Sequence, residues 1–175
     1  MKLDELMKGY TPDENYTGFV TNDDYVLAIN TGKATKEGEY EVVELGVSGL
    51  DSQMNPITQD KTYIRAGQST MKTGTQRSFK VSGDRYVGDA AQDYMLAHGM
   101  KYGTGNAVVT DYVYFCLLNG IGEKGKASII VNSDGSGNAG ESSAVDIELK
   151  KSGSIPEEYK YVASEASMRR KGAEA

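Results

Sequence analysis

The sequence of 175 residues contains no tryptophan, one cysteine, one histidine and three prolines. Because Cys116 is the single cysteine, an intrachain disulfide and a cysteine-based metal site are excluded. Cys116 lies in the apolar run 113–118, so we expect a small buried hydrophobic side chain. No stretch approaches the ~20 apolar residues of a membrane-spanning helix. Residues 1–9 lack the apolar core of a secretory signal, which predicts synthesis in the cytoplasm and no membrane partner.

Groups suited to catalysis are also scarce. No nucleophile stands beside His98, and a lone histidine near a helix end is typical of a capping or core residue. Residues 69–74 contain Ser-x-x-Lys and Lys-Thr-Gly strings, which are separate motifs in penicillin-recognising enzymes. Here they overlap, so Lys72 would have to serve both. We predict no enzyme activity and no catalytic residue, with a Ser69/Lys72 enzyme as the least favoured alternative.

A metal or cofactor site is not indicated either. Residues 132–138 place oxygen-bearing side chains at alternating positions, as at the start of a calcium loop. The twelfth position is Ser143 rather than glutamate, so a flexible hairpin tip is the favoured interpretation. We therefore expect no metal and no cofactor.

The charge balance is acidic, with a formal net charge of −6. Binding to nucleic acid through phosphate neutralisation is disfavoured by that sign. Two interpretations remain open. An acidic surface could line a channel along which DNA slides without adhering. Alternatively, the charge only keeps the chain in solution.

Abundant features are 21 glycines, 12 tyrosines and apolar residues that alternate with polar ones. This mixture suits short strands joined by turns. Residues 107–118 are apolar on both faces, which predicts a central strand or one covered by a helix. The pairs Asn119–Gly120 and Asp134–Gly135 are strong turn signals. Alternation predicts strands over residues 24–30, 39–47, 61–65, 70–82, 107–118, 124–132, 142–150 and 159–162.

One segment departs from this alternation. Over residues 84–100 the apolar side chains follow helical spacing, with Ser82 or Asp84 as the expected cap. The sequence therefore predicts a mainly β (α+β) fold with one flanking α-helix. We divide it into an N-terminal arm (1–22), a β domain (23–163) and a C-terminal tail or arm (164–175).

Three polar, turn-rich extensions stand out, at residues 1–22, 49–60 and 164–175. Long tyrosine-rich strands also leave sheet edges that a monomer has to protect. In an assembly, such arms reach neighbouring subunits and edges pair across them. The extensions are equally compatible with ordinary mobile loops and chain ends.

Several strings resemble, in order, the major tail (tail tube) proteins of siphophages infecting Gram-positive bacteria. These strings lie at residues 62–67, 72–79, 81–89, 98–103, 111–115 and 122–137, within a region of resemblance at about 40–162. The resemblance implies two packed antiparallel β-sheets, sandwich-like or barrel-like, flanked by one helix. It also implies hexameric rings that stack into a non-contractile tail tube in the virion, with a lumen through which DNA passes at ejection.

The same resemblance implies partners and surfaces. The partners are other copies of this chain, a tape measure protein, and tail terminator and distal tail proteins, with DNA only in transit. Acids expected to face the lumen are Glu39, Glu41, Glu44, Asp146 and Glu148. Residues expected to join rings are Leu3, Leu6, Met7, Leu50, Met54, Pro56, Ile57, Arg169 and Arg170.

An alternative from a different functional class is a monomeric β-sandwich that binds carbohydrate or acts as an adhesin. The 12 tyrosines could supply a sugar-stacking platform. Glycan binding without assembly would distinguish it from a tube subunit.

Overall fold

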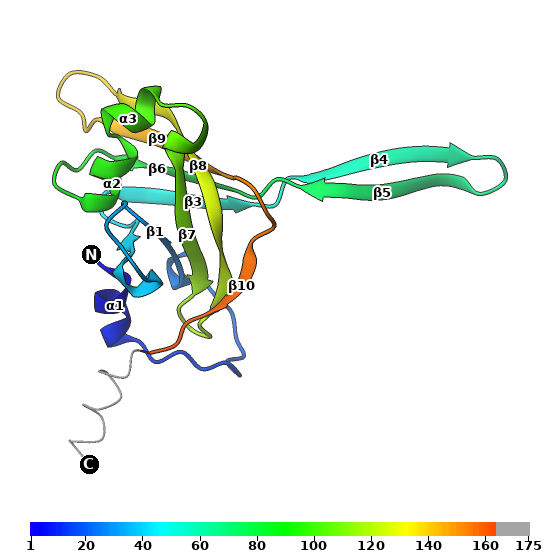
Figure 1. Ribbon diagram of the computed structural model, residues 1–175, viewed down its shortest axis with the longest axis horizontal. Coiled ribbons are helices and arrows are strands. Elements are labelled where there is room, and N and C mark those ends of the chain that lie inside the picture. The colour runs from blue at the N-terminus through cyan, green and yellow to red at the C-terminus, as the bar shows by residue number, and fades with distance from the viewer. Residues whose placement is uncertain (164–175) are drawn as a thin grey trace, which may run out of the picture.

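The computed structural model describes residues 1–163 and confirms a mainly β fold (Figure 1). The helical segments are α1 (Leu3–Leu6), α2 (Ala90–Met95) and α3 (His98–Tyr102), with single 3-10 turns at Met7–Gly9, Asn22–Asp24, Glu37–Glu39 and Gly105–Val108. The strands are β1 (Tyr25–Ile29), β2 (Glu41–Val42), β3 (Val47–Gln53), β4 (Pro56–Tyr63), β5 (Gly67–Thr75), β6 (Ser78–Asp84), β7 (Val109–Cys116), β8 (Ile121–Ser136), β9 (Ala144–Lys151) and β10 (Glu157–Lys160).

The strands form one large antiparallel sheet and one small one. The large sheet has the order β2-β1-β7-β8-β9-β6-β3, and β10 pairs with β8 outside this path. The small sheet consists of β4 and β5. The predicted turn at Asn119–Gly120 is confirmed between β7 and β8, where Gly120 has a φ of 73°. The predicted turn at Asp134–Gly135 is wrong, because both residues lie inside β8 and the chain reverses at 137–143.

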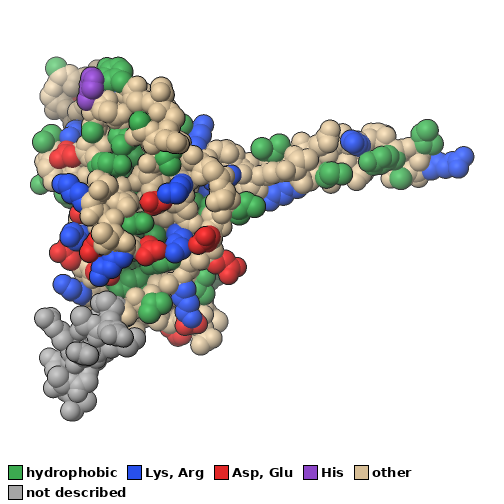
Figure 2. All heavy atoms as spheres, viewed as in Figure 1, with side chains coloured by type: hydrophobic (Ala, Val, Ile, Leu, Met, Phe, Trp, Pro, Cys, Tyr) green, Lys and Arg blue, Asp and Glu red, His purple; other side chains and the backbone are tan. Residues whose placement is uncertain are grey.

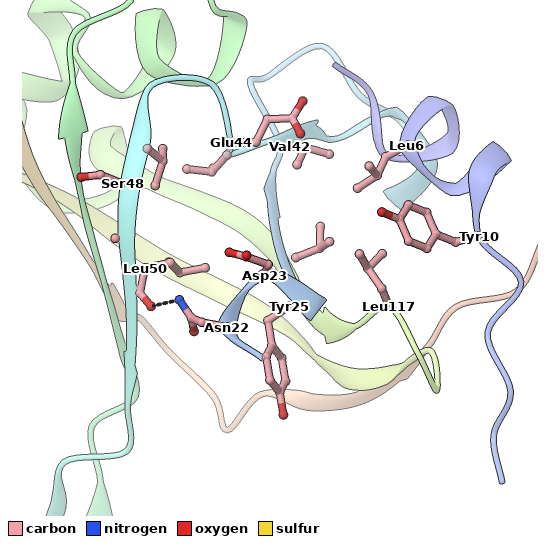
Figure 3. Close-up of a pocket in the computed structure, with 14 residues that line it drawn as sticks. Leu6, Tyr10, Asn22, Asp23, Tyr25, Val42, Glu44, Ser48, Leu50 and Leu117 are labelled. Carbon is pink, nitrogen blue, oxygen red and sulfur yellow. Dashed lines mark hydrogen bonds between the residues drawn. The ribbon is translucent and has the colours of Figure 1, made fainter. Parts of the chain in front are cut away.

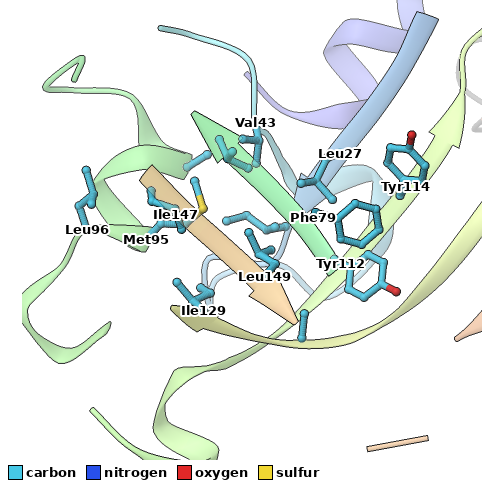
Figure 4. Close-up of a cluster of buried hydrophobic side chains, with 14 of the residues drawn as sticks. Leu27, Val43, Phe79, Met95, Leu96, Tyr112, Tyr114, Ile129, Ile147 and Leu149 are labelled. Atoms are coloured by element: carbon cyan, nitrogen blue, oxygen red, sulfur yellow. The ribbon is translucent and has the colours of Figure 1, made fainter. Parts of the chain in front are cut away.

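Strand β7 lies between β1 and β8 and packs hydrophobic cores on both of its faces, which confirms the central strand predicted there. Cys116 at its end is 4% exposed, as expected. Its Tyr112 and Tyr114 point into the main core (Figure 4). The main core comprises Leu27, Ile29, Val43, Phe79, Val81, Ala91, Met95, Leu96, Tyr112, Tyr114, Ala127, Ile129, Val145, Ile147 and Leu149.

The opposite face of β7 contributes Val113 and Phe115 to a second core, which the N-terminal helix α1 helps to form. The start of the predicted N-terminal arm is therefore packed onto its own domain. Leu3 is fully buried and Met7 is 4% exposed. The second core comprises Leu3, Met7, Val26, Ala28, Val42, Val113, Phe115 and Leu117.

The single helix expected over residues 84–100 is two short helices, α2 and α3, separated at Leu96–Ala97. Its beginning is displaced because Asp84 still pairs with Ala144 in the sheet. The cap is Asp89 rather than Ser82 or Asp84, and its Oδ2 accepts a 2.9 Å hydrogen bond from the amide of Gln92. His98 begins α3 and is exposed, so the expectation of a capping or core histidine was wrong.

The strand predicted over residues 39–47 is largely wrong, since only Glu41–Val42 pairs in β2. Gly46, with a φ of 77°, reverses the chain before β3 begins at Val47. Val42 and Val43 are neighbours in extended chain and point into different cores, whereas Leu45 in the turn is 44% exposed. Sequence alternation does not reveal such a turn, because Val43, Leu45 and Val47 keep a period of two across it and only Gly46 marks it.

The turn-rich segment 49–60 also differs from its expectation. It contains most of β3 and the first half of β4, so the long loop is one side of a β-hairpin. The strand predicted over residues 70–82 is likewise interrupted at Gln76–Arg77, between β5 and β6. Figure 1 shows the β4–β5 hairpin projecting away from the body of the molecule.

Candidate functional site

The β4–β5 hairpin is the most exposed regular element within residues 1–163. Every residue of β4 is exposed, and its backbone pairs only with β5. A two-stranded hairpin is marginally stable in water unless it packs on something else. The hairpin therefore has the features of an arm that binds a partner.

The hairpin has two dissimilar faces, because side chains alternate along paired strands. One face is polar and carries Thr58, Asp60 and Thr62 opposite Lys72, Thr70 and Gln68. The other face carries exposed apolar residues, namely Ile57, Tyr63 and Met71, which are 54%, 49% and 53% exposed. Figure 2 shows hydrophobic side chains along the hairpin and a basic one at its end.

The root of the hairpin is held by side-chain amides. Asn55, with a φ of 44°, donates through Nδ2 to the carbonyl of Gln76 at 3.1 Å and to Oγ of Ser78 at 2.8 Å. Gln76 in turn donates through Nε2 to the carbonyl of Lys151 on β9, also at 3.1 Å. These bonds hold the hairpin to the large sheet at its two connections, between β3 and β4 and between β5 and β6.

A buried charge lies beside this root. Arg77 is 7% exposed, and its Nε donates to Oε1 of Glu123 at 2.8 Å. The same oxygen accepts the hydroxyl of Tyr112 at 3.0 Å. The guanidinium also stacks over Phe79, 4.5 Å from the ring centroid. Burial, together with the Glu123 carboxylate, raises the pKa of Tyr112 above its ordinary range.

A pocket opens between α1, β1 and β3, with a volume of about 260 Å³ (Figure 3). The side chain of Asn22 lines it and donates to the carbonyl of Leu50 at 3.1 Å. Asp23 and Glu44 also line it, and partial loss of solvent raises the pKa of Glu44. Its apolar lining is Leu6, Val26, Val42, Val43, Val47, Leu50 and Leu117.

The acids predicted to face a lumen fall in two groups. Glu39, Glu41 and Glu44 lie in or next to β2, whereas Asp146 and Glu148 lie on β9. Three strands separate β2 from β9 in the sheet. The structure does not bring the two groups together.

Asp146 and Glu148 alternate with buried Val145, Ile147 and Leu149, so the alternation predicted for residues 142–150 is confirmed and the two acids share the polar face of β9. Asp146 forms a 3.2 Å ion pair with Lys80 of β6, and Glu148 a 3.4 Å pair with Lys150. In the first group, Glu41 pairs with the chain's N-terminal amine at 3.2 Å, and Glu39 accepts a hydrogen bond from the amide of Thr35.

The residues predicted to join rings are also dispersed. Leu3 and Met7 are buried in the second core, while Leu6 and Leu50 line the pocket. Met54 stands at the hairpin root and is 51% exposed. Pro56 and Ile57 begin β4. Arg169 and Arg170 lie outside the described residues.

The strings resembling enzyme or metal motifs do not assemble into sites. Ser69 and Lys72 are an odd number of positions apart on β5, so their side chains point to opposite faces of an exposed hairpin. Within residues 1–163 no group of three or more metal-ligating side chains occurs, and no helix is long and apolar enough to cross a membrane.

Comparison with known proteins finds similar structures but no similar sequence. No family model matches the sequence, and no curated protein matches it. A chain from the tail of an empty gene transfer agent particle, refined with C6 symmetry, superposes with a TM-score of 0.53 at 14% identity. The match covers 82% of this chain and 100% of that one. The fold is one found in phage-like tails.

Two further structures share this tail fold. A chain of the native gene transfer agent virion gives a TM-score of 0.51 at 11% identity, covering 82% of this chain and 100% of that one. A chain of the anti-feeding prophage tube-terminating cap gives 0.52 at 11% identity, covering 85% and 96%.

The tip of the β4–β5 hairpin, residues 64–66, is not predicted by the sequence pattern. Residues 61–65 were predicted as a strand, but the strand ends at Tyr63 and Ile64 lies in the turn at the tip. The signal available was Gly67 following Tyr-Ile-Arg-Ala, a glycine at the left-handed position of a hairpin turn.

Proposed function

We propose that the chain is a structural subunit of a non-contractile phage tail tube. In this proposal six copies form a ring, rings stack into a tube, and DNA crosses the lumen at ejection. The fold shared with a chain from a gene transfer agent tail and with a chain of a gene transfer agent virion supports it. The mature location is then the virion tail, after assembly in the host bacterial cytoplasm.

One observation carries the proposal: the β4–β5 hairpin extends from the body with all of β4 exposed. Such a hairpin is stabilised by packing on a neighbour. In a monomer, Ile57, Tyr63 and Met71 would stay exposed to water and would contribute nothing to stability. The edge strand β3 ends the large sheet and offers further backbone groups for pairing between copies, whereas the outer edge of β2 is already paired with residues 1–3.

The decisive experiment is negative-stain microscopy of the purified chain across a concentration series. We expect rings or tubes. A matched variant replaces residues 56–75 by a two-residue Asn-Gly turn, which leaves both cores intact. This variant should still unfold in one cooperative transition and should lose assembly. A strictly monomeric parent chain in sedimentation at high concentration contradicts the proposal.

The lumen is the second part of the proposal. The polar face of β9, which carries Asp146 and Glu148, continues across β6 to β3 and thus toward the hairpin. We assign this face to the lumen in preference to the group at Glu39, Glu41 and Glu44. A cryo-electron microscopy map of the tube tests the assignment, which fails if β9 lies on the outer wall.

The proposed partners are further copies of the chain, a tape measure protein inside the tube, and tail terminator and distal tail proteins at its ends. The likeness to a tube-terminating cap chain supports a terminator that uses a related fold. Co-purification with tagged chain from infected or induced cells would identify these partners.

A further inference from the structure

The tip of the hairpin contains residues that do not stabilise the hairpin turn. Ile64 is 93% exposed at the turn, and Arg65 has a φ of 68°, in the left-handed region. Glycine, asparagine or aspartate would adopt such a turn with less strain. An exposed isoleucine beside a strained arginine therefore points to a contact made outside the chain.

The pocket between α1, β1 and β3 has complementary chemistry. Its volume of about 260 Å³ far exceeds the ~10–15 Å³ that a single water needs, which leaves room for one aliphatic side chain. Val26, Val42 and Leu117 give it an apolar lining. Asp23 and Glu44 add two carboxylates, and neither forms an ion pair within residues 1–163.

Charge distinguishes the hairpin from the chain as a whole. Within residues 56–75, Asp60 is accompanied by Lys61, Arg65 and Lys72, so the hairpin is basic, whereas the whole chain has a formal charge of −6. A basic arm and an acidic pocket attract each other before contact, which favours this pairing over random hydrophobic association.

The tip cannot occupy the pocket of its own chain. The hairpin leaves the body at Asn55 and Gln76 and points away from it, while the pocket lies against β1 and α1 (Figures 1 and 3). The occupant that fits is the tip of a second copy.

We propose that residues 63–65 of one subunit insert into this pocket of another, with Ile64 on the apolar lining and Arg65 facing Asp23 and Glu44. This contact rests on the proposed assembly function and names the surfaces that make it. Because tip and pocket are different surfaces, each subunit offers one of each. The contact can therefore propagate from copy to copy around a ring or along a stack.

Cysteine crosslinking between separately purified chains tests the contact. One variant carries Ile64→Cys and the other Leu50→Cys, and the two are mixed before assembly and then oxidised. We expect a covalent dimer. The matched control pairs Ile64→Cys with Ile155→Cys, a residue 84% exposed and outside the pocket, and should give none. The native Cys116 is buried and stays in all variants.

Charge reversal gives a second, independent readout. Arg65→Glu should raise the concentration needed for assembly by about tenfold or more. Adding Glu44→Arg should restore much of the loss. Lys61→Glu makes the same charge change on β4, away from the turn, and should have a smaller effect.

The outcomes separate this contact from the proposed function. Tubes that form normally but give no Ile64–Leu50 crosslink, or equal crosslinking to position 155, overturn the contact and leave the tube function standing. Assembly unaffected by Arg65→Glu also overturns it. A parent chain that forms neither rings nor tubes overturns both.

Discussion

The Nε of Arg77 lies 2.8 Å from Oε1 of Glu123, and this ion pair joins the root of the hairpin to β8. Its two side chains differ in environment, at 8% and 24% exposed. The guanidinium is shielded from water and contacts the rings of Phe79 and Tyr114 and one carboxylate. The pair therefore fixes where the arm begins, at the cost of a buried charge that needs its partner.

Glu123→Gln should destabilise the fold by about 2–3 kcal/mol, because Arg77 then keeps a buried charge without a counterion. The expected cost stays below that of a fully enclosed pair, since Glu123 retains contact with water. Urea unfolding measures it. Asp134→Asn breaks the exposed Lys101–Asp134 pair and should leave the urea midpoint unchanged. Equal midpoints for the two variants would contradict the role given to Arg77.

Alkaline pH should unfold the chain earlier than an ordinary β domain. Burial raises the pKa of Tyr40 to about 12 and raises the pKa values of Tyr112, Tyr114, Tyr159 and Tyr161. In the unfolded chain tyrosine has a pKa of about 10. Above that value the folded state binds more protons than the unfolded state, so the stability present below pH ~10 is lost as pH rises.

The measurement for this alkaline effect is the urea midpoint at a series of pH values, with tyrosinate absorbance as a second probe. Tyr159→Phe removes one of the affected hydroxyls and should make the decline shallower. Tyr102→Phe, at a residue 74% exposed, serves as the control and should leave the decline as it is. A stability that is constant between neutral pH and pH ~11 would count against the buried phenols.

Asp89→Ala should cost about 1 kcal/mol, because it removes the acceptor for the Gln92 amide at the start of α2. Asp89→Asn keeps an acceptor oxygen and should recover most of the stability. Thermal unfolding of the three proteins checks the order. If Asn were as damaging as Ala, the side chain would act through something other than the cap.

Amide hydrogen exchange should be fast in the hairpin and slow in the body of the chain. In unassembled protein we expect fast exchange for the amides of β4 and β5, since their bonds are exposed and no core covers them. Amides of β7 and β9 should exchange slowly. On assembly, the hairpin amides should become protected while those of β9 change little. Slow hairpin exchange in a confirmed monomer would contradict this division.

The strands predicted correctly are those whose two faces differ or are both apolar. Val145, Ile147 and Leu149 are buried opposite charged neighbours, and β7 is apolar throughout, so side-chain pattern and environment agree. The strand predicted over residues 39–47 was largely wrong because Gly46 turns the chain inside an alternating pattern. The start of the predicted helix was wrong because a long-range pairing, Asp84 with Ala144, keeps that residue in the sheet.

The candidate site was less accessible to sequence reasoning, for a physical reason. A hairpin that packs on no part of its own chain has no buried face, so its residues carry no burial pattern. Polar Thr58 and Asp60 then resemble part of a loop, and only residues 61–65 and 70–82 in this region were predicted as strands. The pocket was equally hidden, because Leu6, Val42 and Leu117 come from three distant segments.

Alternate residues of β7 belong to different cores, so neither core can come apart without removing a strand from the other. We expect the body to melt as one cooperative unit. The hairpin contributes no side chain to either core. In the proposed tube, the hairpin can therefore reorder on a neighbouring copy while the body of its own chain stays native.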